Sequence, residues 1–258
     1  NDTTIPGDTA DTQDISDAEW EQVCPESMVD PLTMSDGADI WAAFLSSAPY
    51  TALHVSLFNE FRWQGDLDGC PIFSVPSEDT IRLAGNCGTP QGSAFSGSVE
   101  LTSTSTSLRV VYEDFSAISK GFPTGSLTLI ADGWVEDTWT DTDYSSAAEL
   151  TYSLGGDRFE ADLRGSFQQR VSARSTETAE GLTERWEGYV RVLASETRAI
   201  GDFCMLAEVD LKETCDLEAE GSYHILGAQE GSLTASSDDC DGCMDAELDG
   251  VAADPYCQ

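Results

Sequence analysis

Residues 158 to 174, RFEADLRGSFQQRVSAR, alternate between polar and apolar side chains. The polar side chains stand at even positions and include Arg158, Arg164, Arg170 and Arg174, whereas the odd positions include Phe159, Ala161, Leu163, Phe167, Val171 and Ala173. Successive side chains of a β-strand point to opposite faces of a sheet, so this stretch predicts one long strand with one buried face. A chain with such a strand must supply neighbours that pair with it.

A partner strand follows in residues 182 to 196, LTERWEGYVRVLASE, where Trp186, Val190, Val192 and Ala194 share a face. With residues 175–181 as the loop, the two strands form a long antiparallel hairpin. Similar patterns occupy residues 96–104, 106–118, 125–137, 148–156, 202–213, 216–227, 231–237 and 244–252. We therefore predict a mainly β fold, a long antiparallel meander sheet that is open, curled or barrel-like, with a small helical N-terminal region and disulfide staples.

The helical region lies between residues 24 and 70. The segment DPLTMSDGADIWAAFLSSAP predicts a helix with Ser35 or Asp36 as its N-cap, an apolar stripe and Pro49 as its end. The stripe consists of Ile40, Phe44 and Leu45. Residues 51–64, TALHVSLFNEFRWQ, fit both the strand and the helix period, and we favour the helix. The chain thus divides into an acidic spacer (1–23), a small helical region (24–70) and an antiparallel β domain (71–258).

The charge of the chain restricts its partners. Forty-eight acidic residues stand against twelve basic ones, for a net charge of −36. Contact with phosphate groups would be repulsive, so nucleic acid and anionic lipid surfaces are excluded as partners. Acidity of this degree is typical of a protein kept soluble in a salty medium, and binding of a cation is the alternative.

Eight cysteines, an even number, indicate disulfides and hence an exported protein of the periplasm, outer membrane or cell surface. Cys70 and Cys87 flank a 16-residue loop that they would staple, and Cys204 and Cys215 bracket one strand in the same way. Cys240 and Cys243 form a C-x-x-C that closes on itself or reaches Cys215 and Cys257, and Cys24 remains as the last candidate. The first residue is Asn1 and not Met, which we interpret as removal of an export signal.

Carboxylate clusters at residues 66–69, 137–145 and 237–250 make Ca²⁺ the strongest cofactor candidate, although none has EF-hand spacing, and we expect no cofactor. His54 and His224, the two histidines of the chain, stand outside any zinc-ligand motif. A serine beside His224 in GSYHILG is the strongest candidate for a nucleophile and base, and a surface histidine on a strand is the simpler interpretation. Trp134 and Trp139 allow a sugar-stacking platform, with core packing as the alternative.

Two segments, GDLDGCPIFSVPSEDTIRLAGNCGTPQGSAFSGSVEL and TCDLEAEGSYHILGAQEGSLTASSDDCDGC, carry a G-C-P turn, a later G-x-C, and a late C-D-x-E and C-D-G-C. In these features the chain resembles acidic, cysteine-stapled, β-rich exported proteins of myxobacteria and their relatives, many of them lipoproteins. The resemblance implies an exported and lipid-anchored location and carries over no catalytic residue.

These observations together predict a structural or interaction protein of the cell envelope, a non-catalytic subunit of a protein assembly. Its partners are other envelope proteins or copies of itself, and it meets a membrane only through an N-terminal lipid. The candidate interaction residues are Arg158, Arg164, Arg170, Arg174, Arg185 and Arg191, because seven of the ten arginines lie between residues 158 and 198. The alternatives are a module that binds lipid, sugar or Ca²⁺, and an envelope hydrolase.

Overall fold

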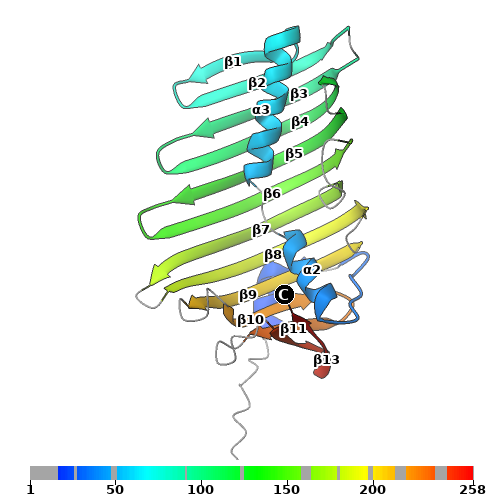
Figure 1. Ribbon diagram of the computed structural model, residues 1–258, viewed down its shortest axis with the longest axis vertical. Helices are drawn as coiled ribbons and strands as arrows, with labels where there is room; N and C mark the ends of the chain where they lie inside the picture. The colour runs from blue at the N-terminus through cyan, green and yellow to red at the C-terminus, as the bar shows by residue number, and fades with distance from the viewer. Residues whose placement is uncertain are drawn as a thin grey trace, which may run out of the picture.

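The computed structural model describes residues 17–25, 28–47, 51–90, 92–122, 125–157, 164–178, 181–196, 200–212, 219–235 and 243–257. In this part of the chain, thirteen strands form one antiparallel sheet in which every strand pairs only with its neighbours in sequence (Figure 1). The strands are β1 (Ile72–Ser77), β2 (Thr80–Gly88), β3 (Ala94–Ser103), β4 (Ser107–Phe122), β5 (Gly125–Trp139), β6 (Asp143–Gly155), β7 (Gly165–Thr178), β8 (Gly181–Ser195), β9 (Gly201–Lys212), β10 (Ala219–Leu226), β11 (Glu230–Ala235), β12 (Cys243–Leu248) and β13 (Val251–Cys257). The predicted mainly β meander is confirmed, and the sheet is open, with β1 and β13 as its edges.

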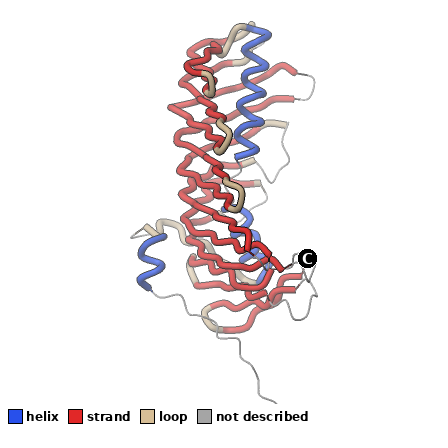
Figure 2. The backbone as a smooth tube through the Cα atoms, turned by 90° about the vertical axis from the view of Figure 1, so that its left-hand side faces the viewer, coloured by secondary structure: helices blue, strands red, loops and turns tan. Residues whose placement is uncertain are grey.

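Three helices accompany the sheet: α1 (Asp17–Val23), α2 (Gly37–Ser47) and α3 (Thr51–Asp68). Figure 2 shows α2 and α3 on one face of the sheet, which we call the inner face, and α1 on the opposite, outer face. α3 crosses β1 and β3–β5, whereas α2 lies over β8–β13. α1 falls within the segment predicted as a spacer, and residues 1–16 of that segment lie outside the described residues.

The predicted helix α2 begins where the sequence indicated. Asp36 is the N-cap, since its Oδ1 accepts the backbone N–H of Asp39 at 3.1 Å. Ile40 and Phe44 are buried against the sheet, but Leu45 is 45% exposed and does not belong to the stripe. The prediction for Leu45 was wrong because position 45 lies about 100° around the helix from position 44, and Ala43 packs in its place.

The ambiguous segment after residue 51 is the helix α3, as favoured, and it continues to Asp68. Leu57, Phe58 and Phe61 are completely buried at helical spacing. Phe61 meets Phe95 and Phe115 of the sheet edge to face, with ring centroids 5.7 and 5.5 Å apart. Each fully buried phenylalanine stabilises the fold by about 1.5–3 kcal/mol, so Phe58 and Phe61 contribute strongly to the packing of α3 on the sheet.

The hairpin of β7 and β8 is longer than predicted at its turn. Residues 175–178 and 181 continue the ladder, with Thr176 opposite Thr183 and Thr178 opposite Gly181, so the predicted loop at 175–181 is mostly strand. Backbone pairing extends the strands here without apolar burial, which is why alternation did not reveal it. The first part of the predicted strand, residues 158–163, lies outside the described residues.

The buried face of this hairpin follows the predicted parity, with one exception. Phe167, Val171, Val190 and Val192 are buried on the inner face, whereas Ala194 is exposed. Phe167 pairs with Val192 and Ser166 pairs with Ala194, which leaves Leu193 as an extra, bulged residue. A bulge shifts the following residue to the other face, so the prediction for Ala194 was wrong.

Two further segments differ from their predictions. Residues 244–252, predicted as one strand, are most of β12, a turn and the start of β13. The turn consists of Asp249 and Gly250 with φ of 49° and 75°, the geometry that an Asp-Gly pair favours between two antiparallel strands. Residues 71–86, predicted as a stapled loop, form most of the β1–β2 hairpin.

Candidate interaction surface

The outer face of the sheet is polar and carries rows of facing side chains. Glu149 stands opposite Arg170, Ser172 opposite Glu187, and Arg185 opposite Glu208. Among the described helices, α1 alone packs on this face, against β8 and β9. Most of the outer face of the described strands is therefore a surface that other molecules can reach.

A small second core fastens α1 to the outer face. Trp20 of α1, Tyr189 of β8 and Cys204 of β9 are buried together. The disulfide Cys24–Cys204 joins the end of α1 to β9 across 180 residues of sequence. Because Cys204 is bonded to Cys24, the prediction that it pairs with Cys215 was wrong, and Cys215 lies outside the described residues.

Asp202 fixes the chain that follows α1. Its carboxylate accepts hydrogen bonds from Nε and Nη2 of Arg191, at 2.7 and 2.8 Å, and from the backbone N–H of Val29 at 2.8 Å. Its backbone carbonyl accepts the N–H of Leu32. Burial acts to raise the pKa of Asp202, but the hydrogen bonds from Arg191, Val29 and Asp30 outweigh it and hold this pKa below the usual value. Asp202 thus stays ionised and ties residues 29–32 to the start of β9.

The structure brings three of the predicted interaction arginines together on the outer face of β7 and β8. We call Arg170, Arg174 and Arg185 the outer arginine patch, and all three are exposed. Arg174 stands directly opposite Arg185, a like-charge pair that is unfavourable by itself. Asp143 at 2.9 Å from Arg174 and Glu187 at 3.6 Å from Arg185 offset that repulsion.

Asp143 beside the patch is paired with Arg174, whereas Arg170 within the patch has no ion-pair partner among the described residues. Hydrogen bonds from Arg174, Thr176 and Thr142 lower the pKa of Asp143, so this carboxylate is ionised wherever Arg174 is paired. Arg170 makes no ion pair within the described part of the chain, although it stands opposite Glu149. In a chain this acidic, Arg170 is a cation with free hydrogen-bonding capacity.

A hollow of about 350 Å³ lies between α1 and the outer arginine patch. Its wall is Gln22 and Val23 of α1, and its floor is the outer face of β5–β8. The side chains that line it include Trp134, Glu149, Arg170, Ser172 and Glu187. The guanidinium of Arg109 stacks over the Trp134 ring at 5.0 Å, so Trp134 is an outer-face residue and not part of the core.

The remaining predicted arginines lie elsewhere. Arg191 is the internal partner of Asp202, and Arg164 pairs with Glu196 at 3.0 Å beside the start of β7. Arg158 lies outside the described residues. Alternation identified the shared face of Arg170 and Arg174. Alternation could not predict that α1 forms the wall of the hollow. Trp20, one helical turn before Cys24 in an otherwise polar segment, was the one sign in the sequence that this segment packs on the protein.

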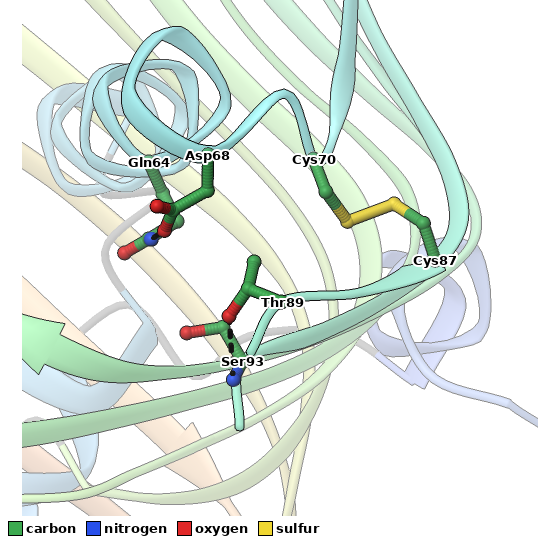
Figure 3. Close-up of a disulfide and its surroundings, with 6 residues drawn as sticks. All are labelled: Gln64, Asp68, Cys70, Cys87, Thr89 and Ser93. Atoms are coloured by element: carbon green, nitrogen blue, oxygen red, sulfur yellow. Dashed lines mark hydrogen bonds between the residues drawn. A yellow bond between two sulfur atoms is a disulfide. The ribbon is translucent and has the colours of Figure 1, made fainter. Parts of the chain in front are cut away.

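The six described cysteines form three disulfides, and none of the six is free. Cys70–Cys87 is the predicted pair, and Figure 3 shows it beside a polar cluster of Gln64, Asp68, Thr89 and Ser93, where the end of α3 meets the strand ends. Cys243 pairs with Cys257, one of the two predicted alternatives, and Cys240 lies outside the described residues. Three disulfides indicate an oxidising environment, extracellular or periplasmic.

The other candidate groups are scattered. Ser222 Oγ and His224 Nε2 lie 3.0 Å apart on β10, with His224 only 8% exposed. Trp139 donates its ring N–H to the Ser105 carbonyl at the end of β5, away from Trp134. Within the described residues, no three His, Cys, Asp or Glu side chains converge as metal ligands. Residues 237–242 of the third acidic cluster are outside that set.

No described helix is both long enough and apolar enough to cross a membrane. Comparisons with known proteins give no match: no family model, no curated protein and no solved structure resembles the chain. The resemblance to exported myxobacterial proteins therefore stays a prediction.

Proposed function

We propose that this protein is an exported structural subunit of the cell envelope, located in the periplasm, in the outer membrane or at the cell surface. It binds an acidic partner protein through the outer arginine patch. The single observation that carries this proposal is the grouping of three exposed arginines on two adjacent strands of a chain with twelve cationic side chains and a net charge of −36.

Electrostatics makes this patch selective. An acidic partner is repelled by most of the surface, so it can approach only where positive charge is concentrated, and the patch therefore sets the orientation of docking. An exposed ion pair contributes only about 0–1 kcal/mol, so the arginines alone do not make a tight complex. Trp134 and the hollow beside α1 supply an aromatic anchor next to the patch, the type of residue that dominates interface energies.

The test compares two variants with the same loss of charge. R170S/R174S removes two patch arginines, and R62S/R82S removes two partly buried arginines outside the patch, each beside one carboxylate. Tagged chains are purified from source cells with disulfides intact and analysed by native mass spectrometry. We expect the wild type and R62S/R82S in a complex with a second protein, and R170S/R174S without it.

Two results would refute the proposal. One is a wild-type chain without a protein partner at low ionic strength. The other is equal loss of the partner in both double variants, because that result reflects total charge and not the patch. A complex that forms through the arginines must also weaken as salt is raised from about 0.15 M to 1 M, since the Debye length falls from about 8 to 3 Å.

The hollow beside α1 favours a second candidate function, saccharide binding. It combines the Trp134 ring with Glu149, Arg170 and Glu187, which are the stacking surface and hydrogen-bonding groups that a sugar requires. Titration with millimolar cellotetraose and chitotetraose, followed by tryptophan fluorescence, tests it. A saturable change that Trp134→Phe abolishes supports sugar binding, and an unchanged wild-type spectrum rules out these two sugars.

A further inference from the structure

The edge strand β1 exposes apolar side chains at the end of the sheet. Ile72, Phe73 and Val75 are 64%, 37% and 57% exposed. Trp63 and Leu67, one turn apart on α3, are 52% and 54% exposed. The Arg62 guanidinium lies 4.9 Å from the Phe73 ring centre, which places this end of α3 against β1. We call these five apolar residues the β1 edge patch.

The β1 edge patch lies beside the backbone N–H and C=O groups along the free edge of β1. In the described part of the chain, β1 pairs only with β2, so its other edge has no partner strand. An edge strand that is apolar and uncharged is a template for pairing with another strand. β1 has the sequence IFSVPS, without a charged side chain, and Pro76 ends the stretch that can pair, because proline has no N–H to donate.

The opposite edge of the sheet is protected. β13 has the sequence VAADPYC, with Asp254 and Pro255 in its middle. It is stapled to β12 by Cys243–Cys257, and its Tyr256 stacks on Trp41 of α2 at 5.3 Å. Charge and proline disfavour the addition of a strand to this edge. The two edges therefore do not match each other, and pairing of β1 with β13 into an open-ended fibre is disfavoured.

The charge of the chain indicates which molecule binds the β1 edge patch. Two chains of net charge −36 repel each other over most of their surfaces, and the repulsion is smallest where both surfaces lack charge. An acidic partner gains nothing from a strand without cations, whereas a second β1 offers the same apolar side chains and the same free backbone. Self-complementary contact of this type is what a two-fold axis produces.

We propose that β1 pairs antiparallel with β1 of a second copy of this chain, so that one sheet continues through a homodimer and the two β1 edge patches cover each other. The inference deepens the proposed function, since the assembly it describes is built from dimers. Pro76 limits the new ladder to residues 72–75, which makes the contact short. The two-fold symmetry of the β1–β1 contact makes the dimer a closed unit.

The experiment is sedimentation velocity on the full, disulfide-intact chain over a range of concentrations. Val75→Lys places a charge in the proposed interface, and Val251→Lys makes the same change on β13, where Val251 is 67% exposed. We expect dimers for the wild type and V251K, and for V75K at least a tenfold higher dissociation constant. Circular dichroism verifies that both variants fold, and Ile72→Lys serves as a second interface variant.

Each alternative outcome overturns the inference. A wild-type monomer at all concentrations excludes the dimer, loss of the dimer in V251K alone places it at β13, and loss in both variants indicates a β1–β13 contact. Salt separates this inference from the proposed function, because screening must strengthen contact between two acidic copies and weaken contact through the outer arginine patch. R170S/R174S must also leave the dimer intact.

Discussion

His54 gives the protein a stability that depends on pH in a defined window. α3 carries this side chain into the interior, where it is 1% exposed and its Nδ1 lies 3.1 Å from the Tyr112 hydroxyl. Its ring contacts those of Tyr112 and Tyr152, with centroids 5.6 and 5.2 Å apart. Burial lowers the pKa of His54 from 6.5 to about 4, because the charged imidazolium cannot be solvated there.

The sign and size of the effect follow from proton linkage. Between pH 6.5 and 4 the unfolded chain binds a proton at His54 that the folded chain does not bind, so stability falls as the pH falls through this window. From pH 7 to pH 5 the loss is about 2 kcal/mol, and below pH 4 it approaches about 3 kcal/mol. Most carboxylates titrate below pH 5, so the upper part of the window isolates the histidines.

The assay is urea unfolding of the disulfide-intact chain at pH 7, 6 and 5. His54→Gln is neutral throughout and should lose much less stability over this range than the wild type, whatever its stability at pH 7. His224→Gln, the matched change at the other histidine, leaves His54 in place and should keep the part of the pH dependence that His54 causes. An identical pH dependence in His54→Gln and the wild type would refute the assignment.

Three further predictions concern the fastening of α1 and the Ser–His contact. Replacing Cys24 and Cys204 by alanine removes a cross-link between residues 180 apart and should lower the unfolding free energy by up to about 5 kcal/mol, measured by urea denaturation, against about 3 kcal/mol for Cys243–Cys257. Asp202→Ala leaves Arg191 without its partner and should cost roughly 3 kcal/mol in the same assay; a loss under about 1 kcal/mol would contradict the anchoring role. Ser222 should not react with a fluorophosphonate probe, because its histidine neighbour is mostly covered, and mass-spectrometric labelling at Ser222 would instead support the hydrolase alternative.

Local periodicity was enough to predict the class of fold. Phe167, Val171 and Val190 are buried where alternation placed them, and Leu57 and Phe61 are buried where the helical period placed them. Both patterns arise from burial of one face, so they identify an element wherever another layer covers it. Alternation also brought Arg170 and Arg174 to one face of the sheet, which is the part of the candidate surface that the sequence could predict.

Features that depend on distant contacts were not predictable. The bulge at Leu193 and the partner of Cys204 are set by neighbours that no local pattern records. Asp202 was one acidic residue among forty-eight, and only its contact with Arg191 distinguishes it. The hollow likewise forms only where α1 packs beside β5–β8, and the pattern of a single strand does not predict that contact.

The sheet can be assembled in the order in which the chain emerges, since each strand needs only the strand before it. Cys24 is the exception, because its partner on β9 follows 180 residues later. In a chain that enters an oxidising compartment with its N-terminus first, Cys24 therefore cannot form its native disulfide until β9 has entered as well. During that interval Cys70 and Cys87 arrive and offer the wrong partners. Closure of Cys24–Cys204 is thus a late event, because it waits for the arrival of Cys204 on β9, and the covalent attachment of α1 to the outer face is completed only then.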